Sequence, residues 1–232
     1  MLGTYTYHES LRRLTIAFGQ IFNNIQIRRK NAADSTLQSL TVPLAYGPKE
    51  KFLVRLDQQA SLEDRSFAIR LPRIGFEISG IEYDPTRKLS RMGKYRVVKT
   101  ATTKRLDYTY NPVPYNISYN LYTFTATAEA GLQIVEQILP YFQPEYTVSM
   151  KMIDEMSDVR DVPIVLQSVT MTDTYEGSFE ERRVIEYTLD FQMKLYFFGP
   201  VYTGEIIKNV IERTYLGIGQ DTGFTSSEID GA

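Results

Sequence analysis

The sequence predicts an α+β fold, in which a mostly antiparallel β-sheet carries two packed α-helices, a basic loop or hairpin projection and a flexible C-terminal arm. Three observations support this prediction. Residues 184–198 alternate apolar and polar side chains almost without a break, which is typical of a long strand with one solvated face. Residues 113–121 alternate in the same way. Residues 7–23 and 128–139 instead carry apolar side chains at helical spacing.

The stretch 115–146 organises the rest of the chain, because it contains a strand, a turn, a helix and an exit marked by prolines. Thr127 is expected to cap the helix, and Pro140 is expected to end it. Gly131 should weaken the helix by about 1 kcal/mol relative to alanine. The helix is expected to bury a stripe of four apolar side chains: Leu132, Val135, Ile138 and Leu139. The exit is expected to form an aromatic cluster: Tyr141, Phe142 and Tyr146.

The N-terminal part of the chain is expected to begin with the helix over 7–23, started by a capping box of Thr6 and Glu9. Alternation then predicts a β-hairpin within 25–46, whose second strand covers 37–46. A short helix is expected over 49–58.

The remaining strands follow from the same pattern. Residues 69–83 are expected to form a strand with a bulge at Gly80. Residues 146–156 are expected to be extended. Residues 164–174 are expected to pair with 184–198 as a hairpin.

The predicted domain organisation is a single α+β domain over 1–216, which includes a basic insertion at 86–106. Within it, 206–216 fits either a helix or a strand. Residues 217–232 are rich in Gly, Ser and Thr and are expected to form a flexible arm.

The insertion at 86–106 holds eight Lys or Arg residues and no Asp or Glu. It is either a solvated flap or a docking surface for an acidic partner or nucleic acid. Eight cations repel one another, which favours a surface of opposite charge nearby. The candidate partner-binding residues are Arg87, Lys88, Arg91, Lys94, Arg96 and Lys99 of the insertion, with Arg28, Arg29 and Lys30 of the first strand.

Composition excludes several functional classes. The 232 residues carry a net charge of −2, so no global field attracts nucleic acid or acidic lipid. Cysteine is absent, which excludes disulfides, thiol nucleophiles and zinc–thiolate sites. The N-terminus lacks a signal-peptide pattern, and no apolar run reaches the roughly 20 residues that cross a bilayer. We therefore expect a soluble protein of a reducing cytoplasm.

The search for catalytic motifs finds no P-loop, dinucleotide fingerprint, serine nucleophile or zinc-protease motif. No Ser or Cys nucleophile motif accompanies the single histidine, His8. Asp154, Glu155, Asp158 and Asp161 could bind a divalent metal, but a solvated loop is the ordinary use of such a cluster. We therefore expect a binding or structural module, with no enzyme activity, cofactor or metal.

A remote alternative is a single-stranded nucleic-acid binder that uses the basic insertion and stacks bases on tyrosines. The tyrosines considered are Tyr108, Tyr110, Tyr115, Tyr119 and Tyr122.

Residues 132–146, LQIVEQILPYFQPEY, resemble the tail sheath stabiliser and completion proteins of contractile-tailed bacteriophages. Further blocks resemble that family in the same order and cover most of 5–200: FNNIQIRR (22–29), VPLAYGPKEKF (42–52), LPRIGFEISGIEYD (71–84), YNPVPYNISYNLYTF (110–124) and ERRVIEYTLDFQM (181–193). The sequence resembles the family least in residues 86–106 and in the short C-terminal segment.

The resemblance implies a virion protein that is assembled in the bacterial cytoplasm and forms a hexameric ring at the head-proximal end of the tail. Such a ring caps tube and sheath, prevents early contraction and offers a docking surface to the neck. The implied partners are copies of the chain, the tail sheath protein, the tail tube or its terminator, and neck or head-completion proteins. Neither a membrane nor direct nucleic-acid binding is implied, and the family offers no catalytic residues. The alternative is a tail tube terminator or neck adaptor ring.

Three hypotheses follow for the mechanism. An unpaired edge strand can supply part of the contact between subunits, and the strand 184–198 or the hairpin 25–46 is expected to lie near a subunit boundary. The basic insertion is expected to face an acidic neighbour. Replacement of Leu139 by aspartate is expected to abolish soluble protein.

Overall fold

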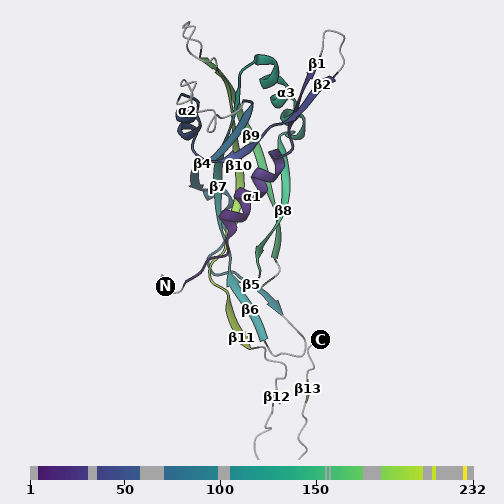
Figure 1. Cartoon of the computed structure of the whole chain (residues 1–232). Helices are drawn as coiled ribbons and strands as arrows, with labels where there is room; N and C mark the ends of the chain where they lie inside the picture. The colour runs from purple at the N-terminus through teal and green to yellow at the C-terminus, as the bar shows by residue number, and fades with distance from the viewer. Residues whose placement is uncertain are drawn as a thin grey trace, which may run out of the picture.

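The computed structural model describes residues 5–30, 36–57, 71–98, 105–154, 156, 158–174, 184–205, 211–212 and 227–228. Within these ranges, three α-helices accompany strands that pair mostly antiparallel, which confirms the predicted α+β class. Figure 1 shows a long central sheet flanked by the helices, with a hairpin at one end and a smaller sheet at the other.

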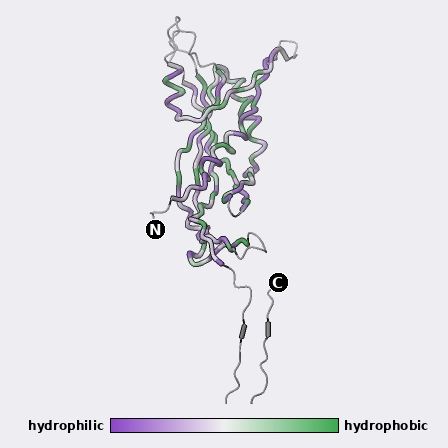
Figure 2. Tube along the Cα trace, turned by 60° about the horizontal axis from the view of Figure 1, so that its bottom comes forward, coloured by the Kyte–Doolittle hydropathy of each residue, from purple (hydrophilic) through white to green (hydrophobic). Residues whose placement is uncertain are grey.

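The central sheet has six strands in the order β3–β4–β7–β10–β9–β8. All neighbours in this order pair antiparallel except β3 and β4, which are parallel. Figure 2 shows hydrophobic and hydrophilic residues mixed along these strands, as expected for a sheet with two different faces. The strands are β3 (Leu44–Tyr46), β4 (Arg73–Tyr83), β7 (Val113–Thr125), β8 (Glu145–Ile153), β9 (Asp158–Thr174) and β10 (Val184–Phe197).

The predicted strand 184–198 is confirmed as β10, and its pairing with β9 is the predicted hairpin partnership. Its other side pairs with β7 in an unbroken register from Ile185 with Thr125 to Phe197 with Val113. Over Ile185–Met193 both sides of β10 are paired, so this part of the strand offers no open edge for a subunit contact. The location of β10 near a subunit boundary stays a prediction.

Several predicted bounds shift. The strand β9 begins at Asp158, before the expected 164. The predicted bulge in β4 is confirmed, because the register with β7 shifts between Ile78 and Gly80. The predicted extended segment 146–156 forms β8.

The helices α1 (Ser10–Phe22) and α3 (Ala128–Ile138) cover one face of the sheet. Phe18 of α1 lies at the centre of the core, with its ring centroid 4.6 Å from that of Tyr119 and 5.4 Å from those of Phe76 and Phe191. The side chains of Phe18 and Tyr119 are fully buried. Aromatic contacts of this kind stabilise a core beyond the burial of their area.

The predicted capping box of α1 is not formed. Glu9 is the N-cap residue, has a positive φ of 56° and makes no side-chain capping hydrogen bond. The helix begins at Ser10, three residues later than expected from 7–23. The Glu9 carboxylate lies instead 3.5 Å from Nη1 of Arg12, one helical turn along the chain.

The predicted cap of α3 is confirmed, because the Thr127 hydroxyl accepts a hydrogen bond from the Ala130 amide. The prediction of the buried stripe is only partly confirmed. Leu132 and Leu139 are 57% and 42% exposed, while Val135 and Ile138 are buried as expected. The stripe is completed by Gly131 and Ile134.

The aromatic exit after α3 passes through a short 3₁₀ turn, Leu139–Tyr141. Phe142 is buried, with its ring centroid 5.0 Å from that of Phe191 and 6.0 Å from that of Tyr146. Tyr141 is exposed and makes no part of this cluster. The predicted cluster is therefore confirmed only for Phe142 and Tyr146.

The helix α2 (Lys49–Asp57) confirms the predicted short helix and packs on the opposite face of the sheet. Its Phe52 contacts Tyr122 and Phe124, which alternate along β7 with the residues that face α1. Lys49 Nζ lies 2.6 Å from the carboxylate of Glu186, a buried residue on β10. The ion pair thus fixes α2 to one end of this face.

The rest of that face is polar and open. Asn116, Ser118 and Asn120 of β7 lie across from Lys194, Gln192 and Asp190 of β10. All six are partly exposed, which confirms the predicted solvated face.

The predicted hairpin 25–46 forms between β1 (Gln26–Lys30) and β2 (Thr36–Thr41). The expected second strand, 37–46, divides because the chain changes sheets after Thr41. The Val42 amide donates to Ile25. The next residue, Pro43, has no amide hydrogen to continue the ladder, and its carbonyl accepts from Ile74 of the central sheet. The strand β3 then pairs with β4.

The basic insertion is a hairpin rather than a loop over its described part. After a 3₁₀ turn at Pro85–Arg87, β5 (Lys94–Val98) pairs with β6 (Arg105–Tyr110). β6 also pairs with β11 (Tyr202–Glu205), which completes a three-stranded sheet in the order β11–β6–β5.

Most of the C-terminal part of the chain lies outside the described residues, and with it most of the predicted flexible arm, 217–232, and of the ambiguous segment 206–216. Two short strands are described there, β12 (Ile211–Glu212) and β13 (Ser227–Glu228), which pair antiparallel.

Candidate functional site

In the three-stranded sheet β11–β6–β5, side chains alternate between the two faces, and the cations of β5 and the acids of β6 and β11 lie on different faces. Lys94 lies opposite Tyr110, and Arg96 lies opposite Tyr108, which in turn lies opposite Tyr202. Cross-strand neighbours of this kind share a face. We call this surface the Lys94 face, and its residues are Lys94, Arg96, Tyr108, Tyr110 and Tyr202.

The Lys94 face combines cations with exposed aromatic rings. Lys94 Nζ lies 4.8 Å from the ring centroid of Tyr108 and 5.3 Å from that of Tyr110. The rings of Tyr108 and Tyr202 are stacked, with centroids 5.5 Å apart. Each cation–π contact at an exposed site contributes about 0.5–1 kcal/mol, so the tyrosines hold the Lys94 ammonium in place while leaving it accessible to solvent.

The acidic residues of this sheet lie on its other face. Asp107 of β6 is 2% exposed and accepts a hydrogen bond of 3.2 Å from the Thr203 hydroxyl. Glu205 of β11 follows the same alternation as Thr203. The Lys94 face therefore carries no carboxylate among the described residues of the three strands.

Packing of the inner face fixes the orientation of the sheet. Tyr95 and Val97 pack against the main core. The guanidinium of Arg160, from β9, lies 5.0 Å from the ring centroid of Phe198 and 5.9 Å from that of Tyr95. Thr109 is fully buried and donates a hydrogen bond to the Pro200 carbonyl at 3.3 Å. The opposite, Lys94 face is thereby directed to solvent.

Arg87 has a different environment from the other candidate residues of the insertion. Its Nε donates to the Asp84 carboxylate at 2.7 Å, and its Nη2 donates to the Asn116 side chain at 2.8 Å and the Tyr115 carbonyl at 3.1 Å. Its guanidinium also lies 5.1 Å from the ring centroid of Tyr196. This partly buried side chain connects the insertion to the central sheet.

The pKa of Asp84 is held well below its usual range. The hydrogen bond from Arg87 is the main cause, and the hydrogen bonds from the Thr86 hydroxyl and amide add to it. The carboxylate therefore stays ionised and paired through the pH range in which most proteins are folded.

The remaining predicted site residues fall in two separate places. Lys88 and Arg91 are exposed in the segment between the 3₁₀ turn and β5. Lys99 lies outside the described residues. Arg28 and Arg29 are exposed on β1, and Lys30 ends that strand. Figure 1 places the β1–β2 hairpin at one end of the molecule and the β5–β6 hairpin at the other, so the candidate cations form two surfaces.

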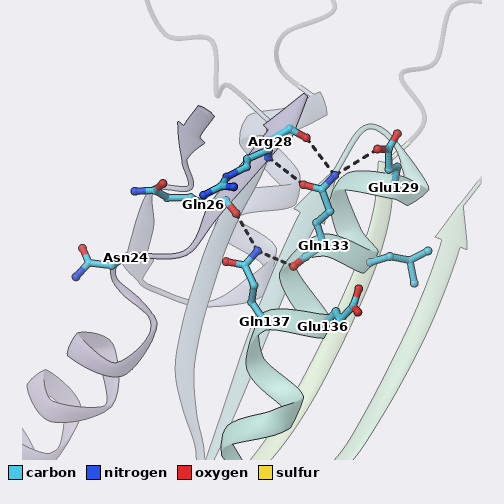
Figure 3. A pocket seen from close by; sticks show the side chains of 8 residues that line it. Asn24, Gln26, Arg28, Glu129, Gln133, Glu136 and Gln137 are labelled. Atoms are coloured by element: carbon cyan, nitrogen blue, oxygen red, sulfur yellow. Dashed lines mark hydrogen bonds between the residues drawn. The ribbon is translucent and has the colours of Figure 1, made fainter. Parts of the chain in front are cut away.

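The β1–β2 hairpin rests on α3 through two glutamines (Figure 3). The Gln133 side chain accepts from the Arg28 amide at 3.0 Å and donates to the Arg28 carbonyl at 3.1 Å. Gln137 donates to the Gln26 carbonyl at 2.8 Å. These contacts lie in an open groove of about 680 Å³ between β1 and α3. The glutamines thus satisfy the backbone edge of β1 as a neighbouring strand would.

Sequence reasoning missed three of these residues. The sequence does not link Tyr202 to the basic insertion, although Val201, Tyr202 and Thr203 are residue types enriched in strands and follow a Gly-Pro break. Gln133 and Gln137 are four residues apart, which places them on one helical face. Their backbone partners on β1 could not be read from that spacing.

The described acidic residues of 154–161 each have their own partner. Arg13 donates to Asp154, which lowers the pKa of that carboxyl, while Arg160 donates to Asp158 and Ser149 donates to Asp161. Glu155 lies outside the described residues. Among the residues that the structure describes, no group of three His, Cys, Asp or Glu is arranged to hold a metal ion.

His8 lies with its Nε2 2.9 Å from the Gly199 carbonyl oxygen, close to the entry of the chain into β11. In the described part of the chain, no helix has the length and apolar character needed to cross a membrane.

Comparison with known proteins identifies relatives of the whole chain. The T4-like virus Myoviridae tail sheath stabiliser family matches residues 5–229. The tail completion protein gp15 of Enterobacteria phage T4 is 32% identical over 224 residues, which cover 94% of this chain and 80% of that protein. The matched range includes the central sheet, both hairpins and the Lys94 face. The chain therefore belongs to the tail sheath stabilisers of T4-like Myoviridae, which are structural components of the virion tail.

Proposed function

We propose that the protein forms a closed ring at the head-proximal end of a contractile tail. There it caps tube and sheath, keeps the sheath extended and offers a docking surface to the neck. The observation that carries this proposal is the match of residues 5–229 to the sheath stabiliser family. The description of the T4 relative as a tail completion protein supports a role in finishing the tail. The family resemblance of the sequence blocks leads us to propose six copies.

A ring needs contacts that repeat around an axis, and the two projecting hairpins offer suitable surfaces. In a ring, each copy uses one surface toward one neighbour and a different surface toward the other. Many copies then share the load of a strained sheath, so each single contact can be modest.

The Lys94 face is the proposed contact to an acidic neighbour, either the sheath subunit or a neck protein. The charge sorting within the small sheet supports this assignment, because the cations face solvent while Asp107 is buried. Arginine and tyrosine are enriched at the energetic centres of protein interfaces. Charge complementarity would also orient the partners as they approach.

We infer that the protein works through binding alone and performs no turnover chemistry. The support for this inference is its membership of a family of structural tail proteins. A substrate-dependent rate that rises with protein concentration would overturn it.

The direct test is the mass of the purified protein in solution, alone and together with its sheath subunit. Masses of a closed oligomer, alone or on the sheath, support the ring. A monomer under both conditions contradicts it. Electron microscopy of tails assembled without the protein separates the alternatives. Unstable or contracted sheaths support a stabiliser, whereas tubes of uncontrolled length indicate a tube terminator.

A further inference from the structure

The two edges of the β1–β2 hairpin are treated differently by the fold. Gln133 and Gln137 occupy the backbone groups of Arg28 and Gln26 on the outer edge of β1. The backbone amide and carbonyl of Arg28 therefore point away from its β2 partner Ser39. In an antiparallel ladder, both residues of a non-hydrogen-bonded pair direct their backbone groups outward. The amide and carbonyl of Ser39 consequently point out of the free edge of β2.

The edge of β2 lacks the features that usually prevent strand addition. Its sequence, TLQSLT, holds no charged residue and no proline. The other outer strands of the described sheets differ. β8 carries Glu145 and Lys151, β5 carries Lys94 and Arg96, β11 carries Glu205, and β3 has three residues. Charged residues and short length are common devices against edge-to-edge pairing, so β2 is the least protected of these edges.

A complementary edge lies at β8, the last strand of the central sheet. The Lys151 carbonyl accepts from Arg13 of α1 at 3.1 Å, so it points out of the sheet edge. Alternation along the strand turns the backbone of Ser149 outward in the same direction. A groove of about 340 Å³ runs beside this edge, between α1 and residues 148–151 of β8.

The groove has apolar character on its α1 side. Ile16 is 51% exposed there, and Val148 is partly exposed on the strand. A sheet edge beside a helix is a known setting for the addition of an extended strand, whose alternate side chains enter the groove.

We propose that β2 of one copy adds to β8 of a second copy, with Ser39 opposite Ser149. In this register Leu40, which is partly exposed, enters the groove beside Ile16 and Val148. Arg28 shares a face with Ser39, and Asp161 shares a face with Ser149. The added hairpin therefore carries Arg28 toward Asp161.

Charge complementarity favours a second copy as the occupant. Arg28 and Arg29 are exposed on the hairpin, and Glu145 of β8 and Asp161 of the adjacent strand β9 are exposed near the β8 edge. Lys151, the cation of this edge, lies 3.7 Å from Asp154. The contact joins two different surfaces, so it repeats from copy to copy and closes into a ring where the rotation permits. This inference rests on the proposed ring and specifies one of its subunit contacts.

Cross-linking can test this contact directly, because the chain has no native cysteine. Full-length Ser39→Cys and Ser149→Cys proteins are mixed with each other, alone or together with the sheath subunit. The fraction that has the mass of an oligomer is then isolated. A short thiol-specific cross-linker should then join the two variants, while neither variant alone should cross-link efficiently. Ser118→Cys, on the open polar face, replaces Ser149→Cys as the control and should give no product above background.

The outcomes separate this inference from the proposed function. Cross-links of Ser39→Cys to itself or to the sheath subunit overturn the β2–β8 contact, and so does an oligomer in which the mixture gives no product. The ring survives these results. If no oligomer forms under either condition, the ring itself fails and the inference fails with it.

A second variant keeps the test independent of cross-linking chemistry. Ser39→Pro removes an amide that points away from β1, so the hairpin should persist while strand addition is lost. We expect at least a tenfold weaker association of copies and an unchanged melting temperature of the monomer. Ser39→Ala is the matched control, since it removes only the hydroxyl that donates to Gln26, and should associate normally. Equal association of the two variants would contradict the proposal.

Discussion

The ring of Tyr187 lies directly against the backbone of Gly131. A Cβ atom built on Gly131 would stand 2.4 Å from Cε2 of Tyr187 and 3.2 Å from the Thr125 hydroxyl oxygen. This close approach lets α3 pack on β10 and β7, where Tyr187 and Thr125 are both buried. The glycine that weakens the isolated helix is therefore the residue that allows it to dock.

Replacement of Gly131 by alanine should destabilise the protein. Helix propensity alone would favour alanine by about 1 kcal/mol, but overpacking of a filled site costs about 1–3 kcal/mol. We expect a net loss of about 1 kcal/mol in the free energy of unfolding, measured by chemical denaturation. Gly80→Ala is the control, because no atom lies within 4 Å of its added Cβ. A Gly131→Ala protein more stable than the wild type would show that Tyr187 moves aside freely.

The exposure of Leu139 corrects the expected effect of Leu139→Asp. This side chain is 42% exposed, whereas its neighbour Ile138 is 3% exposed. Leu139→Asp should give soluble, folded protein. Ile138→Ala should lower the free energy of unfolding by about 2–5 kcal/mol. Expression yield, circular dichroism and denaturation of the two variants test the contrast. Insolubility of Leu139→Asp together with a stable Ile138→Ala would contradict the assigned face of α3.

The Asp84–Arg87 pair should make the stability of the fold depend on pH in the acidic range. The pKa of Asp84 is lower in the folded chain than in the unfolded one. Its contribution is therefore complete above the unfolded pKa of about 3.9 and declines as the pH falls below that value. Asp84→Asn should be less stable than wild type at pH 7, and the difference should shrink as the pH falls below about 4. Thermal melts across pH 2–7 measure both effects, and a difference that widens in acid would contradict the pairing.

Charge reversal on the Lys94 face should weaken docking without unfolding the protein. The double variant Lys94→Glu with Arg96→Glu should lose at least about tenfold in affinity for the sheath or neck protein. Lys88→Glu with Arg91→Glu changes the net charge equally, lies in the preceding segment and should lose less. Calorimetry with purified partners compares the two. Equal losses would show that net charge, rather than this face, directs docking.

The same variants test the nucleic-acid alternative. Binding of single-stranded DNA that weakens steeply with salt and is abolished in the Lys94 and Arg96 variant would support base stacking on the tyrosines. The proposed function predicts no such binding at physiological salt. A gel-shift titration at two salt concentrations distinguishes these results.

The sequence by itself determined the long strands and the position of the helices. Residues 184–198 and 113–121 alternate because one face of each strand is buried and the other is solvated, and this property is local. The cap at Thr127 and the bulge near Gly80 also follow from local chemistry. The basic insertion fitted either a loop or a hairpin, and the pairing of β5 with β6 decided for the hairpin. The blocks that resemble sheath stabilisers identified the family correctly.

Only the tertiary structure decided which strands have open edges and which cations share a surface. The central place of β10, the split between β2 and β3, and the approach of Tyr202 to Tyr108 depend on contacts between residues far apart in the chain. The buried stripe of α3 was ambiguous for a related reason. Apolar residues surround much of that helix, so the bulk of Tyr187 at Gly131, rather than the spacing of leucines, selected the face that packs.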